Sequence, residues 1–212
     1  MEATGEQLVS VRTAHQIDHR HVLGRCDDHI HGDVAVAQAA ASDPEFRAAL
    51  AYRWAPIHYQ DVDVTGGDSL SGRSDYLSRI NFDEDWSTSD SWEALAGIKP
   101  RAYVYYSVVE TSSHWYIIYA FYHPRDWADH PLSGLDTHEN DLEGALFIVA
   151  RPGSSSSSTY GTLQGMVTVF HHDFYSFTPQ GGALRGGDQD IDGTIRWKES
   201  GGYKRPVTAQ EA

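Results

Sequence analysis

Hydrophobic and polar positions alternate most regularly in the second half of the chain. Runs rich in Val, Ile, Tyr, Phe and Trp, divided by turn residues, cover residues 101–110, 113–123, 142–151 and 160–170. This composition and spacing predict strands. We expect residues 101–123 and 142–172 to form one antiparallel sheet system. The hydrophobic positions expected to be buried are Ile118, Phe121, Leu146, Ile148 and Val169.

Two of these runs, 113–123 and 142–151, are apolar at both odd and even positions. Such runs predict central strands that are covered on both faces, as in a sandwich of two sheets. We therefore predict a mainly β protein, an antiparallel β-sandwich with a few short peripheral helices. Residues 33–212 are predicted to form a single β-sandwich domain with an N-terminal helix.

The first half contains the helical signals. From Asp33 to Trp54 the pattern is helical, and Ser42 precedes Glu45 by three positions, as in a capping box. A strand is expected within residues 55–64, and a second, short helix within 88–97 that is capped by Ser or Asp and ends at Gly97. The last twelve residues, 201–212, show no clear element.

Composition and charge exclude several classes of protein. The formal net charge of -14, with no stripe of Lys and Arg, argues against a nucleic-acid partner. No stretch approaches the roughly 18 consecutive apolar residues of a transmembrane segment. The single cysteine, Cys26, excludes an internal disulfide framework. No signal-peptide pattern is visible, and both a secreted and a cytoplasmic location stay open.

Residues 1–32 are polar and contain five of the twelve histidines at irregular spacing. A helical metal site would place histidines at regular intervals such as i and i+4. We interpret this segment as a polar N-terminal arm, separate from the sandwich domain.

Charged residues stand between the two most apolar runs. Asp126 follows one run, and Asp141 and Glu143 begin the next; being two apart, these two carboxylates point to the same side of a strand. His138 precedes them, and His171 or His172 could arrive from a third strand. Taken singly, Asp126 could be a turn residue, Asp141 a loop cap, and His171 and His172 a hydrogen-bonded pair. Together, mainly oxygen ligands with a minority of nitrogen suit Mg²⁺, Ca²⁺ or Mn²⁺.

The same residues carry a resemblance. The run "YAFYHPRD" and the motif His138-x-x-Asp141-x-Glu143 resemble the necrosis- and ethylene-inducing-peptide-like proteins. "LAYRWAPIHYQD" and "HENDLEG" are also similar to domains related to a vacuolar sorting protein. The resemblance covers roughly residues 48–176 and departs from both families at Leu142, where a Trp is usual.

The resemblance implies a β-sandwich that holds a divalent cation. Its implied ligands are Asp126, His138, Asp141, Glu143 and, from the family's His-x-x-Tyr, His172 with Tyr175 close by. In those secreted proteins the metal site belongs to a surface that engages the sugar head group of a membrane sphingolipid.

Three functions are therefore open. The first is a cation-dependent module that binds a small molecule, glycan or lipid head group, with peripheral contact to a membrane and an apolar contact from the Trp127 loop. The second is a metal-dependent hydrolase or lyase in which His130, His171 or His172 acts as the base. In the third, the ion is a structural brace for the strand ends.

Overall fold

The computed structural model describes residues 15–16, 43–60, 62–129, 137–153, 158–170, 173–180 and 191–210. The elements in these ranges are β1 (His15–Gln16), α1 (Pro44–Trp54), β2 (Ile57–Gln60), α2 (Ser91–Gly97), β3 (Tyr105–Glu110), β4 (His114–Asp126), β5 (His138–Ala150), β6 (Thr162–Phe170), β7 (Asp173–Thr178), β8 (Gly193–Thr194), β9 (Trp197–Ser200) and β10 (Tyr203–Gln210). Apart from β1, the predicted N-terminal arm lies outside the described residues. No helix in the described ranges is long and apolar enough to cross a membrane.

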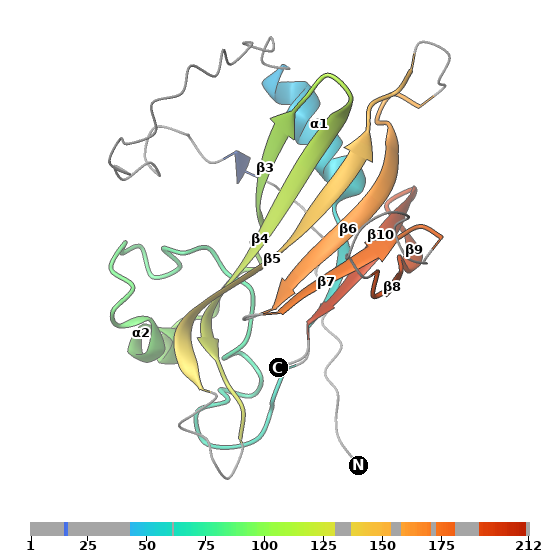
Figure 1. Cartoon of the computed structure of the whole chain (residues 1–212). Coiled ribbons are helices and arrows are strands. Elements are labelled where there is room, and N and C mark those ends of the chain that lie inside the picture. Colours follow the sequence, from blue (N-terminus) through green and yellow to red (C-terminus); the bar gives the residue numbers. More distant parts are fainter. Residues whose placement is uncertain are drawn as a thin grey trace, which may run out of the picture.

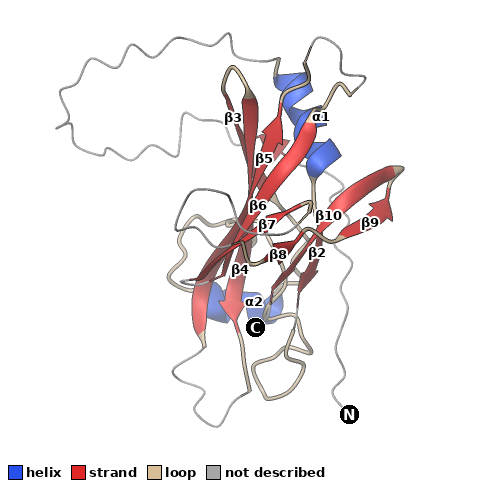
Figure 2. Ribbon diagram, turned by 45° about the vertical axis from the view of Figure 1, so that its right-hand side comes forward, coloured by secondary structure: helices blue, strands red, loops and turns tan. Residues whose placement is uncertain are grey.

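The strands form two sheets (Figures 1 and 2). The larger has the order β1-β3-β4-β5-β6-β7-β8, and the smaller has the order β2-β10-β9. Neighbours from β3 to β7 are antiparallel, which confirms the meander predicted for the four apolar runs. Parallel pairs occur between β1 and β3, β7 and β8, and β2 and β10. The mainly β sandwich with short helices is therefore confirmed.

Burial alternates over residues 114–121 of β4 and 141–150 of β5, because successive side chains of a strand point to opposite faces. Phe121 is buried, as predicted, but Ile118 is 42% exposed, and that prediction was wrong. Leu146, Ile148 and Val169 are half-buried. In residues 114–120 of β4 and 142–150 of β5, the odd-numbered side chains are buried. The even-numbered side chains, on the opposite face, are half-buried or exposed.

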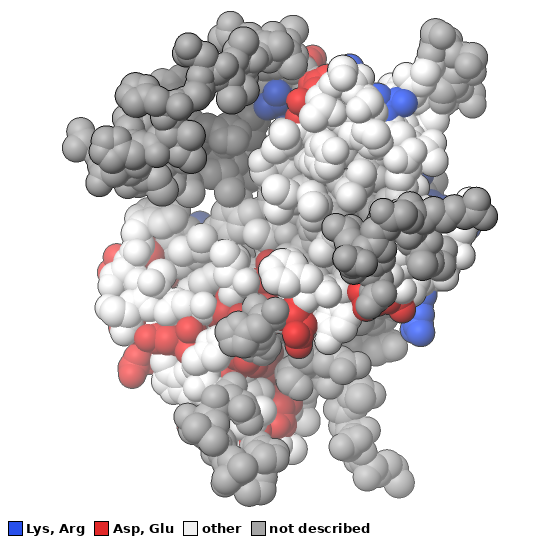
Figure 3. Space-filling view, viewed as in Figure 1, with Lys and Arg blue, Asp and Glu red and all other residues white. Residues whose placement is uncertain are grey.

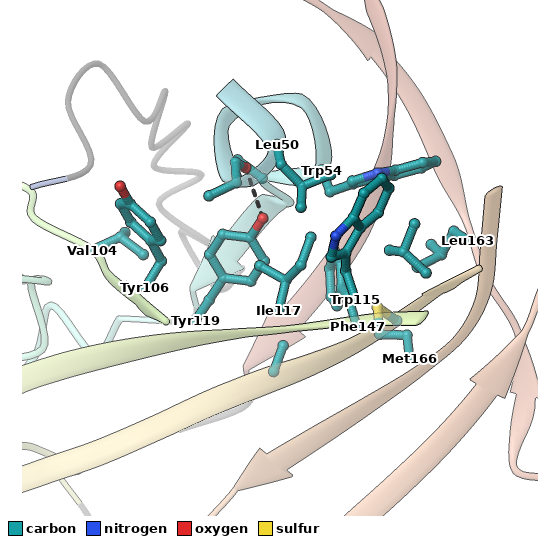
Figure 4. Close-up of a cluster of buried hydrophobic side chains, with 14 of the residues drawn as sticks. Leu50, Trp54, Val104, Tyr106, Trp115, Ile117, Tyr119, Phe147, Leu163 and Met166 are labelled. Atoms are coloured by element: carbon teal, nitrogen blue, oxygen red, sulfur yellow. Dashed lines mark hydrogen bonds between the residues drawn. The ribbon is translucent and has the colours of Figure 1, made fainter. Parts of the chain in front are cut away.

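The main core lies between the large sheet and α1 (Figure 4). Trp115, Ile117 and Tyr119 of β4 contribute alternate side chains to it, and Leu50 of α1 packs against them. The Tyr119 hydroxyl donates a hydrogen bond of 2.7 Å to the carbonyl of Ala51 in α1. This bond satisfies the one polar atom of a fully buried tyrosine.

The start of α1 differs from prediction. The N-cap of α1 is Asp43, whose Oδ1 accepts a hydrogen bond from the Glu45 backbone at 3.0 Å, so the predicted cap at Ser42 was wrong by one residue. Both carboxylate and hydroxyl side chains serve at N-caps, which is why the sequence did not separate them. The end of α1 at Trp54 and the extent of α2 are confirmed.

The C-terminal segment was misjudged. Residues 203–210 form β10, which pairs with β2 in parallel and with β9 in antiparallel fashion. Its partner β2 lies far away in the sequence, and no local turn signal announces a parallel pairing. Arg205 of β10 donates hydrogen bonds to the carbonyls of Tyr52 and Ala55, so β10 also closes the end of α1.

Candidate metal centre

Three metal-ligating side chains meet between the two sheets at one end of β4 and β5. His123 is the cross-strand partner of Asp141, and Phe121 is the partner of Glu143, so all three side chains share one face. One ligand atom from each of His123, Asp141 and Glu143 lies within 4.8 Å of the other two. The three residues are only 1%, 6% and 3% exposed. We call them the buried His-Asp-Glu cluster.

The sequence predicted two of the three cluster residues. The spacing of Asp141 and Glu143 placed both carboxylates on one side of a strand, and the structure brings them together. His123 was missed because it lies inside an aromatic run that read as core strand. Its signal was positional: it follows Phe121 by two residues, so it continues the inward-facing set of β4.

Both strands change faces just beyond the cluster. Arg125 stacks over the ring of Trp92 in α2 at 4.1 Å and donates a hydrogen bond to the Trp92 carbonyl. Glu139 accepts a bond of 2.9 Å from the Trp92 backbone, and its neighbour Asn140 accepts one from Ser91, also in α2. Consecutive residues 139 and 140 thus meet the same helix. The left-handed backbone of Asn140 (φ 64°) permits this break in alternation.

Asp126 and His138 lie beyond this break. The two residues are cross-strand partners, and His138 Nε2 lies 3.6 Å from Asp126 Oδ2. Asp126 is buried, and its charge acts on His123, whereas 45% of the His138 side chain is exposed. One member of the pair is therefore buried and the other is half-exposed.

His123 is held as a neutral imidazole. Burial lowers its pKa, against the opposing effects of the Asp75 carbonyl and of the Asp141 and Asp126 charges. Its Nδ1 lies 2.7 Å from the Asp75 carbonyl oxygen, which can only accept, so Nδ1 carries the proton. The other ring nitrogen, Nε2, therefore presents a lone pair, the form in which histidine binds metals.

Asp75 supports the site through its side chain as well. Burial, together with the nearby charge of Asp126, raises the pKa of Asp75 to about 8, although the Trp127 backbone N–H opposes the shift. That N–H donates to Asp75 Oδ1 at 2.7 Å. The residue that follows Asp126 is thereby tied to the segment that orients His123.

The Trp127 ring is also built into the interior. It is 8% exposed, and its Nε1 donates to the Thr65 carbonyl at 3.0 Å. A Cβ on Gly66, which has a φ of +73°, would come within 2.7 Å of this ring, so only glycine fits beneath it. The sequence predicted an apolar contact with a ligand here. The structure instead uses the ring to hold residues 64–66.

The remaining predicted residues fall into two groups. Tyr175 of β7 is 41% exposed and pairs with Thr168 of β6, a buried residue. Its role as a ligand contact stays a prediction. His130, His171 and His172 lie outside the described residues, so their predicted roles as ligands or bases are predictions too.

The surface around this end of the sandwich is acidic. Figure 3 shows Asp and Glu over the lower part of the face in view, where α2 and the lower ends of β4 and β5 lie. Exposed acidic residues of this region are Glu84, Asp85, Asp90 and Glu93. An acidic surface raises the local concentration of cations.

Comparison with known proteins gives structural neighbours only. No protein-family model and no curated protein matches the chain. A solved structure titled a toxin fold for microbial attack and plant defence has a TM-score of 0.39 and 16% identity, covering 74% of this chain and 65% of its own. The non-toxic HaNLP3 protein has a TM-score of 0.38 and 15% identity, with coverages of 74% and 66%.

A third structure is Necrosis and Ethylene inducing Protein 2 from the causal agent of cocoa's witches' broom disease. Its TM-score is 0.28 at 18% identity, covering 46% of this chain and 39% of its own. The chain thus spans less than two thirds of the length of each neighbour. With TM-scores below 0.5, these matches assign neither a family nor a function to the chain.

Proposed function

We propose that this protein binds one divalent cation through His123, Asp141 and Glu143, and that the cation serves to hold a glycan or lipid head group. The observation that carries the proposal is the convergence of three buried ligand atoms within 4.8 Å. Two of them belong to carboxylates, and the third is a histidine nitrogen that faces them as an acceptor.

The physical reason lies in the chemistry of these atoms. Carboxylate oxygens and the lone pair of a neutral imidazole are all acceptors, and none of them can donate to another. Carboxylates that stand close together repel each other when both are ionised, and a positive charge between them relieves the repulsion. A divalent cation supplies that charge and accepts all three atoms as ligands.

The donor set favours a particular class of metal. Two carboxylates and one imidazole suit a cation that takes oxygen readily and tolerates nitrogen. Of Mg²⁺, Ca²⁺ and Mn²⁺, the three predicted from the sequence, Mn²⁺ best meets this requirement. Asp126, His138 and His172 stay proposed as further ligands.

The head-group role rests on the asymmetry of the site. The three cluster residues are buried, whereas 45% of the His138 side chain is exposed. A cation held from one side keeps coordination positions for hydroxyl or carboxylate oxygens of a ligand. A purely structural ion is the second candidate, favoured by the deep burial of the three cluster residues.

Calorimetric titration tests whether the protein binds a divalent cation at the buried His-Asp-Glu cluster. Mn²⁺, Mg²⁺ and Ca²⁺ would be titrated into chelator-treated wild type, Asp141→Asn and Glu143→Gln, with Glu199→Gln as the control. Glu199 is an exposed carboxylate of β9, so its variant makes the same chemical change away from the cluster. We expect wild-type affinity in the control and at least a tenfold loss in the two cluster variants. Equal affinity in all four proteins would remove the cluster from the proposal.

Vesicle sedimentation distinguishes head-group binding through the cation from a purely structural ion. Phosphatidylcholine vesicles with and without a neutral glycosylceramide would be mixed with the protein in Mn²⁺ or in chelator. Binding that needs both the sugar and the cation supports head-group recognition. A protein that takes up the cation and stays unbound in all four mixtures carries a structural ion.

A further inference from the structure

The small sheet reaches the cluster through one side chain, Gln60 at the end of β2. Gln60 is 3% exposed, and its amide Nε2 lies 2.9 Å from Nδ1 of His123. The Asp75 carbonyl lies 2.7 Å from the same Nδ1. Two groups from different segments therefore converge on the same ring nitrogen.

Hydrogen-bond chemistry decides how Gln60 is oriented. The Asp75 carbonyl only accepts, so Nδ1 of His123 is a donor, and an amide NH₂ opposite it would be a second donor. In this orientation the amide oxygen of Gln60 is buried without a hydrogen-bond partner among the described residues. The amide oxygen and nitrogen occupy nearly equivalent positions, and exchanging them removes both conflicts.

We infer that Gln60 is a positioning residue for His123: its amide oxygen and the Asp75 carbonyl together accept the Nδ1–H, which directs the Nε2 lone pair toward Asp141 and Glu143. His123 Nε2 is itself buried and makes no hydrogen bond among the described residues. The consequence for metal affinity rests on the proposed function. The ring orientation does not, because it concerns the metal-free protein.

The arrangement makes the orientation of His123, on the large sheet, depend on the small sheet. His123 belongs to β4 of the large sheet, while Gln60 belongs to β2, which pairs with β10 of the small sheet. Next to this contact, His58 of β2 stacks on Phe121 of β4, with ring centroids 4.3 Å apart. The packing that holds the sandwich together thus also fixes the tautomer of the imidazole.

Acceptors behind a metal-binding histidine commonly change metal affinity by about 10- to 100-fold when they are removed. Gln60→Met keeps the length of the side chain and removes the amide. Gln60→Glu keeps an acceptor oxygen, so it should keep the His123 ring protonated at Nδ1. Gln164→Met is the matched control, because Gln164 Oε1 accepts from the exposed His114 at the other end of β4, 3.0 Å from its Nε2.

Nitrogen-15 NMR of the histidine rings reads the tautomer directly, in chelator-treated protein whose fold is checked by circular dichroism. We expect His123 of wild type, Gln60→Glu and Gln164→Met to be protonated at Nδ1, and Gln60→Met to show a mixture of tautomers. In Mn²⁺ titrations, Gln60→Met should bind about tenfold more weakly than wild type, and Gln60→Glu at least as tightly.

Two results would overturn the inference. One is a wild-type His123 protonated at Nε2, which needs no variant and applies even if Gln60→Met does not fold. The other is a folded Gln60→Met with wild-type nitrogen shifts. A wild type that takes up no cation while Gln60→Met still loses the Nδ1–H tautomer would reject the proposed function and leave the positioning role intact.

Discussion

The two ends of β4 and β5 present the same face to the interior and fill it in opposite ways. At one end, alternate residues are apolar and pack beneath α1: Trp115, Ile117, Tyr119, Phe147 and Val149. At the other end, the same alternation delivers His123, Asp141 and Glu143. The strand geometry is continuous, and only the chemistry of the inward side chains changes.

This difference separates stability from function along one pair of strands. Each buried aromatic side chain of the apolar end contributes free energy through burial and contact. Each carboxylate of the cluster instead has a desolvation cost, which burial among polar groups or a bound cation must offset. The proposed cation would act at this end and not at the apolar one.

The largest effect is expected from the apolar end. Phe147→Ala removes a fully buried ring that lies edge-on to Tyr119, with centroids 5.2 Å apart, and should lower the free energy of unfolding by about 3–5 kcal/mol. Urea denaturation measures the loss. Mn²⁺ affinity of the folded protein should stay within about twofold of wild type. A large loss of affinity would mean that the two ends are not independent.

Removing the cation should lower the free energy of unfolding through the buried His-Asp-Glu cluster alone. At a free Mn²⁺ concentration of about 100 times Kd, the free energy of unfolding should rise by about 2.7 kcal/mol relative to protein in excess chelator. Glu143→Gln should show a much smaller rise. Denaturation curves that coincide with and without Mn²⁺, after elemental analysis confirms removal, contradict the proposed site.

An effect that is smaller per step, because it accumulates with each pH unit, concerns the metal-free protein. Burial raises the pKa of Asp75 from an ordinary 3.8 to about 8, so folding favours its protonated form. The stability that this form provides is complete below pH 3.8 and is lost as pH rises toward 8.

Asp75→Asn has no such titration. Between pH 5 and 7.5, wild type should lose stability relative to this variant by up to about 1.4 kcal/mol per pH unit. Urea denaturation in chelator at four pH values provides the measurement. Parallel pH profiles for the two proteins would show that Asp75 is ionised in the fold.

The smallest effect should come from Leu142, which stands between the two carboxylates in sequence and is 59% exposed on the opposite face. Leu142→Thr should change stability by less than about 0.5 kcal/mol and leave Mn²⁺ affinity unchanged. Denaturation and calorimetry on the same sample decide the point. A change comparable with that of Glu143→Gln would show that alternation does not hold at the cluster.

The sequence was informative where local patterns determine structure. Apolar runs with short connections predicted β3 to β6, and a two-residue spacing predicted the shared direction of Asp141 and Glu143. Both are consequences of the strand repeat, which any chain expresses locally. Ile118 was misplaced because an apolar run does not reveal which of its faces is covered.

The parts that could not be predicted depend on contacts distant in sequence. His123 joins the cluster because it lies across from Asp141 in the register and because Asp75 and Gln60 approach it from other segments. The left-handed backbone of Asn140 accompanies a hydrogen bond from Ser91 of α2, again a contact with a distant segment. Neither feature has a local signature.

The parallel pairing of β2 with β10 sets an order of events during folding. Gln60 lies in β2, whose hydrogen-bonded neighbour within the described chain, β10, begins at Tyr203. Contacts between residues so far apart in sequence form slowly, because a long loop must close first. The meander of β3 to β6 can assemble with every cluster residue present while His123 still lacks its support. During synthesis, the proposed cation site becomes complete only after β10 has been made.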